Sequence, residues 1–97
     1  MAKLKPFDAA QYITTDEECA DLLTDAFATG DVAYIANALG VIARAKGMTE
    51  IAREAGVTRE ALYKALSPAG DPKLSTLLGV MKALGVSLSA SPAHPAE

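Results

Sequence analysis

Apolar residues recur every three or four positions along most of this chain, which is the period of an amphipathic α-helix. Five such stretches are separated by short segments that contain glycine, serine or proline. The pattern predicts an all-α fold, a compact domain of five helices. We expect the domain to span residues 15–88, between an N-terminal arm at 1–14 and a disordered tail at 89–97 whose prolines are typical of a frayed end.

The first two helices have clear start and stop residues. Thr15 and Glu18 have the spacing of a capping box, and Asp31 can cap a second helix that runs to Lys46. Glycines follow both helices, at positions 30 and 47. The predicted inward residues are Cys19, Leu22, Leu23, Ala26 and Phe27 in the first helix, and Val32, Ile35, Ala36, Leu39, Ile42 and Ala43 in the second. The second helix is also apolar on its other side, at Tyr34, Ala38, Val41 and Ala45, so we predict that it is the most buried.

The last helix is predicted to follow a loop after Leu66, with Asp71 as its N-cap and Pro72 as its first residue. It should close the core beneath residues 48–66, through an apolar side formed by Leu74, Leu77, Leu78, Met81 and Leu84. Val86–Ser89 then alternate apolar and polar residues. This alternation fits a short strand that pairs with a second copy of the chain, and it fits a frayed end equally well.

Residues 48–66 have the spacing of two short helices joined at a sharp corner, the arrangement of a helix-turn-helix. Thr49 is expected to cap the first helix, and Gly56 should end it, because glycine adopts positive φ without penalty. Ala52 is small enough to let the two helices approach closely. The shared apolar side consists of Ile51, Ala55, Val57, Leu62 and Ala65.

The outward side of the second short helix is a candidate DNA-reading surface. Thr58 is a good N-cap, and the first exposed turn carries Arg59 and Glu60, which could contact guanine and cytosine in the major groove. Tyr63 and Lys64, one turn later, suit sugar and phosphate contacts. The alternative is a helical hairpin that merely packs, in which Arg59 and Glu60 form a solvated helix start and Glu60 pairs with Lys64.

Charge is divided along the chain. Residues 1–43 carry two basic and seven acidic groups, a net charge of −5, whereas residues 44–66 carry five basic and three acidic groups, a net charge of +2. Since the whole chain is at −3, one copy should hold DNA weakly, and we expect a homodimer that reads a palindrome. The acidic front is either a solvated helix surface or a docking surface for a basic protein.

Composition excludes several other classes of protein. The 97 residues suffice for one small core, and Cys19 falls on an apolar side, where a buried, reduced thiol is expected. No apolar run approaches the roughly 20 residues needed to cross a bilayer, and the start lacks a secretion signal, so we expect a cytoplasmic protein. His94 stands alone, and the carboxylates have no nucleophile at a useful spacing. We predict no metal, no cofactor and no enzymatic activity.

From Pro6 to Leu88 the chain resembles the probable addiction-module antidote family, the HigA-like antitoxins of bacterial toxin–antitoxin operons. The resemblance is carried by P-F-D near the start, G-D at Gly30, A-L-G-V-I-A-R-A-K-G-M-T, R-E-A-L-Y-K-A-L, and G-D-P-K-L-S-T-L-L followed by K-A-L-G. It implies a Cro/C1-type helix-turn-helix protein that neutralises a small RelE/HigB-like toxin, typically a ribosome-dependent mRNA-cleaving enzyme, and represses its own operon. A free-standing phage-type repressor is the alternative, and a helical adaptor without DNA binding is a third reading.

The resemblance also assigns candidate residues. It implies that Thr58, Arg59, Glu60, Tyr63 and Lys64 lie in the recognition helix, and that Thr49 and Ser67 meet phosphates at its flanks. Asp71 departs from the family pattern, in which many members have asparagine. Because such toxins are commonly basic, the acidic first helix is a candidate toxin-binding surface, through Glu17, Asp21 and Asp25. Phe7 and Tyr12, in the arm, can pack either on the domain or on a partner.

Overall fold

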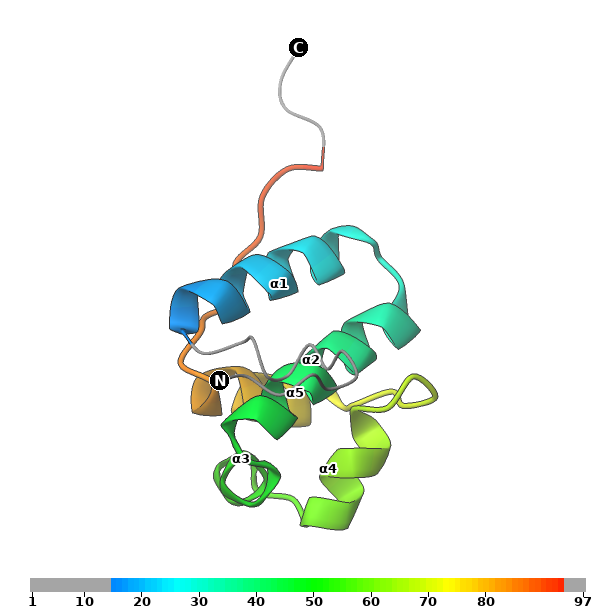
Figure 1. The fold of residues 1–97 in the computed structure, drawn as a ribbon. Helices are drawn as coiled ribbons and strands as arrows, with labels where there is room; N and C mark the ends of the chain where they lie inside the picture. The colour runs from blue at the N-terminus through cyan, green and yellow to red at the C-terminus, as the bar shows by residue number, and fades with distance from the viewer. Residues whose placement is uncertain (1–14, 94–97) are drawn as a thin grey trace, which may run out of the picture.

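The computed structural model of the protein describes residues 15–93 and contains the five predicted helices (Figure 1). They are α1 (Asp16–Ala28), α2 (Val32–Lys46), α3 (Met48–Ala55), α4 (Arg59–Ala65) and α5 (Leu74–Ala83). Residues 86–89 belong to no strand within the described part of the chain. The predictions for Phe7, Tyr12 and His94 fall outside the described residues.

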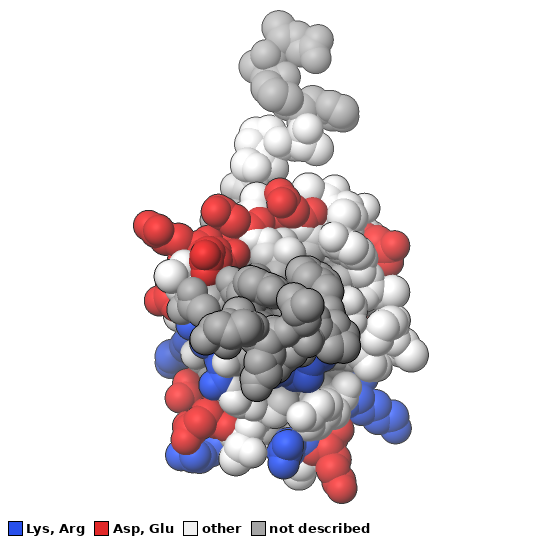
Figure 2. Space-filling model, viewed as in Figure 1, with Lys and Arg blue, Asp and Glu red and all other residues white. Residues whose placement is uncertain are grey.

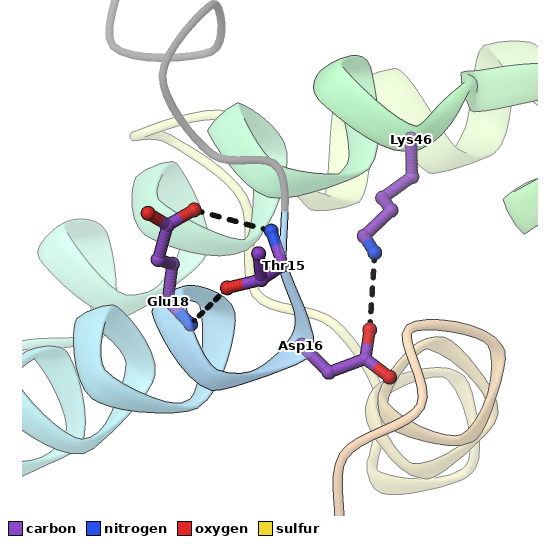
Figure 3. Close-up of polar contacts among 4 residues, drawn as sticks. All are labelled: Thr15, Asp16, Glu18 and Lys46. Atoms are coloured by element: carbon purple, nitrogen blue, oxygen red, sulfur yellow. Dashed lines mark hydrogen bonds and ion pairs between the residues drawn. The ribbon is translucent and has the colours of Figure 1, made fainter.

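The start of α1 has the predicted capping box. The Thr15 hydroxyl accepts a hydrogen bond from the Glu18 N–H at 3.0 Å, and the Thr15 N–H donates to the Glu18 carboxylate at 3.1 Å (Figure 3). In the next residue, the Asp16 carboxylate lies 3.2 Å from the ammonium of Lys46. This ion pair links the start of α1 to the end of α2, although solvent exposure limits an ion pair of this kind to about 1 kcal/mol or less.

The core is aliphatic and centred on α2, which contributes more buried residues than any other helix: Ala36, Ala38, Leu39, Gly40, Ile42 and Ala43. The prediction that α2 is the most buried helix is therefore confirmed, as is its N-cap, because the Asp31 carboxylate accepts from the Tyr34 N–H at 3.2 Å. Three apolar residues on which this prediction relied are exposed: Val32, Tyr34 and Ala45. Val32 is 55% exposed, since it lies in the first turn, before α2 reaches the packed interior.

Cys19 of α1 is completely buried in this core, as predicted, and its thiol is free. Burial raises the pKa of its thiol; the positive charge of Lys46 opposes this rise, and the carboxylates of Asp16 and Glu18 add to it. The thiol is therefore neutral near pH 7 and packs as a small apolar group.

Helix α5 packs against α3 through part of the predicted side, because Leu77, Met81 and Leu84 contribute to the core, but its start differs from the prediction. Its N-cap is Lys73 rather than Asp71, and no side chain caps it. Val80 and Met81 are buried, whereas Leu74 is 66% and Leu78 is 47% exposed. Because apolar residues occur on almost every side of this helix, their spacing alone could not determine which side faces the core.

Two glycines allow helices to approach more closely than any other residue would. A Cβ atom on Gly40 of α2 would overlap the carbonyl oxygen of Leu66, the residue that ends α4. A Cβ atom on Gly79 of α5 would lie 3.0 Å from the Cα atom of Ala55 in α3. These contacts fix α4 and α3 against the rest of the domain.

We predict that Gly40→Ala destabilises the protein. In an open helix this change would add about 1 kcal/mol of stability through helix propensity. Here the new methyl group meets backbone that cannot swing aside, so the free energy of unfolding should fall by about 1–3 kcal/mol. Urea denaturation measures the change, with Asn37→Ala, at an exposed position of the same helix, as the control. A Gly40→Ala variant as stable as the original protein would contradict the close approach.

Candidate nucleic-acid interface

The predicted bend between two short helices is present at Gly56. This residue has φ 77° and ψ 26°, the left-handed conformation that glycine adopts most easily. Its N–H donates to the carbonyl of Arg53 at 3.2 Å, and the Val57 N–H donates to the carbonyl of Ala52 at 3.0 Å, which closes the end of α3. Ala52 is 3% exposed, as expected for a small residue at a helix crossing.

Helix α4 starts where the sequence predicted. The hydroxyl of Thr58 accepts a hydrogen bond from the Ala61 N–H at 3.0 Å and so caps the first turn. The inner side of α4 is anchored by Leu62, which is completely buried. The cap and the anchor together orient the other side of the helix toward solvent.

The predicted cap of α3 is wrong. Gly47 is the single residue between α2 and α3, so α3 begins at Met48 and no side chain caps it. Since no non-helical residue is left between Gly47 and Thr49, Thr49 lies in the first turn of α3. It is exposed and its hydroxyl caps nothing.

Four candidate residues share the exposed side of α4: Arg59, Glu60, Tyr63 and Lys64. The guanidinium of Arg59 lies 5.5 Å from the centre of the Tyr63 ring, and it donates a long hydrogen bond of 3.5 Å to the Tyr63 hydroxyl. This stacking holds Arg59 along the helix surface. The alternative pair between Glu60 and Lys64 is absent from the ion pairs of residues 15–93.

Ser67 follows α4 directly and is half-buried. Its hydroxyl donates to the carbonyl of Lys64 at 2.9 Å, so it helps to close the end of the helix. The structure therefore brings Thr58, the exposed side of α4 and Ser67 together on one element, whereas Thr49 lies on α3, at the end remote from Gly56.

The acidic candidates lie on a different part of the molecule. Glu17, Asp21 and Asp25 are exposed along α1 at four-residue spacing, which places them on one side of that helix. None of the three belongs to an ion pair in the part of the chain that the structure describes. Figure 2 shows carboxylates gathered over α1 and charges of both signs at the opposite end of the molecule, where α3 and α4 lie in Figure 1.

The sequence analysis did not single out the residues of α2 that adjoin α4. Asn37, Gly40 and Arg44 line a pocket together with Tyr63 and Ser67. Their spacing of three and four residues places them on one side of α2, and this spacing is the feature of the sequence that could have identified them. The sequence does not show that this side of α2 faces α4.

Within residues 15–93, no group of three or more histidine, cysteine or carboxylate side chains is arranged to hold a metal ion. No helix in that range is long and apolar enough to span a membrane.

Comparison with known proteins gives two matches. Residues 3–92 match the family described as "Probable addiction module antidote protein". An uncharacterized protein of Haemophilus influenzae is 46% identical over 84 residues, which is 87% of each chain. No solved structure matches the chain.

Proposed function

We propose, on the premise that this chain belongs to the addiction-module antidote family, that it is a HigA-like antitoxin with two binding activities. One is direct, non-enzymatic neutralisation of a small basic RelE/HigB-like toxin. The other is repression of its own operon in the cytoplasm, through sequence-specific binding to operator DNA.

The observation that carries the DNA-binding activity is the bent pair of α3 and α4, with one side of α4 exposed. An eight-residue helix, a left-handed glycine and a capped second helix support the proposal of a Cro/C1-type helix-turn-helix. The exposed side then enters the major groove. Arg59 reads a guanine and Glu60 a cytosine, while Tyr63 and Lys64 contact the backbone.

A homodimer completes this activity. With a net charge of −3, one copy has little nonspecific attraction for DNA, and one short helix reaches only a few base pairs. A two-fold axis would place a second α4 about one DNA turn away and roughly double the contacts. The operator is then a palindrome. Thr49 and Ser67, which flank the groove-reading residues along the chain, contact phosphates.

The toxin-binding activity belongs to α1. All five charged residues of this helix are carboxylates, and Glu17, Asp21 and Asp25 form its continuous acidic side. A basic toxin is attracted to that side, and the attraction accelerates encounter. Phe7 and Tyr12 precede this helix and supply apolar contacts to the toxin. Because α1 and α4 lie at opposite ends of the domain in Figure 1, the two activities need not compete for one surface.

Arg59→Ala tests the proposed base contact. The change should cost about 1–3 kcal/mol of binding free energy on the operator, and it should remove the preference at one base position. Titration of the variant against operators altered at single positions measures this effect, and Arg53→Ala, which removes an exposed arginine from α3, is the matched control. Equal weakening on every DNA sequence would show instead that Arg59 contacts phosphate.

Reversal of charge on α1 tests whether toxin binding and DNA binding use separate surfaces, at α1 and at α4. A triple variant with Glu17→Lys, Asp21→Lys and Asp25→Lys should capture the toxin at least ~10-fold more slowly at low salt, since steering contributes about 10- to 1,000-fold to association rates. Operator affinity should not fall, because the α1 carboxylates lie away from α4 (Figure 1) and the added positive charge does not repel DNA. Stopped-flow association with the protein encoded beside this gene measures capture, and Asp71→Lys controls for a charge reversal away from α1. Parallel loss of toxin and operator binding would count against separate surfaces.

A further inference from the structure

A small pocket lies between α2 and α4, beside the proposed DNA-reading side chains. Its volume is about 140 Å³, and its polar lining consists of Asn37 and Arg44 from α2, Tyr63 from α4, and Ser67 after it. Met48, the first residue of α3, also lines it. Three helices and a loop therefore converge on this pocket, although only two of them belong to the helix-turn-helix.

Hydrogen-bond donors predominate among the polar groups of the pocket. Arg44 carries a full positive charge, belongs to no ion pair within residues 15–93, and is exposed. The hydroxyl of Tyr63 accepts from Arg59, which leaves its own proton free to donate outward. Asn37 offers an amide N–H₂ group. No Asp or Glu side chain lines the pocket.

The start of α3 adds a second source of positive potential. The first N–H groups of a helix have no partner within the helix, and here no side chain caps them. A helix start of this kind attracts anions. Since Met48 both begins α3 and lines the pocket, the start of α3 and Arg44 border the same pocket.

The size and position of the pocket restrict its ligand. Pockets for cofactors and metabolites usually measure about 300–1,000 Å³, so about 140 Å³ suits a single small group. The pocket also shares Tyr63 with the surface that carries Arg59. A group bound in it is therefore close to whatever α4 binds.

We propose that this pocket binds one phosphodiester group of DNA, with Arg44 as its principal ligand and Asn37 and the Tyr63 hydroxyl as neutral donors. The inference rests on the proposed DNA-binding function and adds α2 to the interface. A phosphate held here would fix α4 along its groove from the side, so the register of Arg59 on the bases would depend on a residue outside the helix-turn-helix. Gly40 permits this arrangement, because its missing side chain lets α2 reach the end of α4.

The test compares Arg44→Gln with Lys82→Gln, which removes one positive charge from an exposed position of α5. Each full-length variant is titrated with an operator duplex and with an unrelated duplex, over a range of salt concentrations. One lost phosphate contact reduces the slope of log K against log[salt] by about 0.9. We expect this reduction for Arg44→Gln on both duplexes, and an unchanged slope for Lys82→Gln.

Tyr63→Phe removes a neutral donor and keeps the ring, so it should weaken binding to both duplexes without a change in slope. Equal slopes for the original protein and Arg44→Gln would overturn the proposed pocket, while the DNA-binding function would stand. Absence of DNA binding by the original protein would refute that function itself. Titration with inorganic phosphate distinguishes free phosphate from a phosphate group of DNA. If the pocket binds inorganic phosphate tightly, but Arg44→Gln leaves the salt slope of DNA binding unchanged, the pocket is a free-phosphate site and the proposal is wrong.

Discussion

The arrangement of this domain depends on the corner at Gly56 and on the support beneath it. The left-handed glycine turns the chain between α3 and α4, and α3 is held from below because Gly79 lets α5 approach the Ala55 backbone. On the other side, Gly40 lets α2 reach the residue that ends α4. With both ends of the bent pair fixed, only one side of α4 remains for solvent. The backbone contacts at Gly40 and Gly79 therefore determine which side of α4 is exposed, and so which of its side chains can reach a partner.

The two ends of the domain differ in chemistry for reasons that can be traced to the core. Helix α2 crosses the middle of the domain and separates α1 from α4, so these two helices can differ in charge without contact between them (Figure 1). The charged side chains of α1 are all carboxylates, whereas α3 and α4 carry charged side chains of both signs. Since surface charge affects association more than folding, this separation is compatible with the two proposed binding activities on a domain of fewer than a hundred residues.

Most features set by local interactions were predictable from the sequence, although the caps predicted at Thr49 and Asp71 were wrong. The capping box at Thr15, the caps at Asp31 and Thr58 and the turn at Gly56 each depend on residues within four positions of one another. Features set by packing between distant segments were not. The rotation of α5, which exposes Leu74 and buries Val80, is determined by α3, and the roles of Gly40 and Gly79 appear only when two helices are placed together. For the same reason the outward residues of α4 could be predicted, whereas the α2 side of the pocket could not.

The central claim is that the exposed side of α4 reads a particular DNA sequence. The most direct measurement compares the affinity of the unmodified protein for the duplex upstream of its own operon with that for a scrambled duplex of equal length, at one moderate salt concentration. Specific recognition typically gives a ratio of about 10³ or more, and a ratio in that range is what the account predicts. Equal affinity for the two duplexes, or binding to neither, would contradict it.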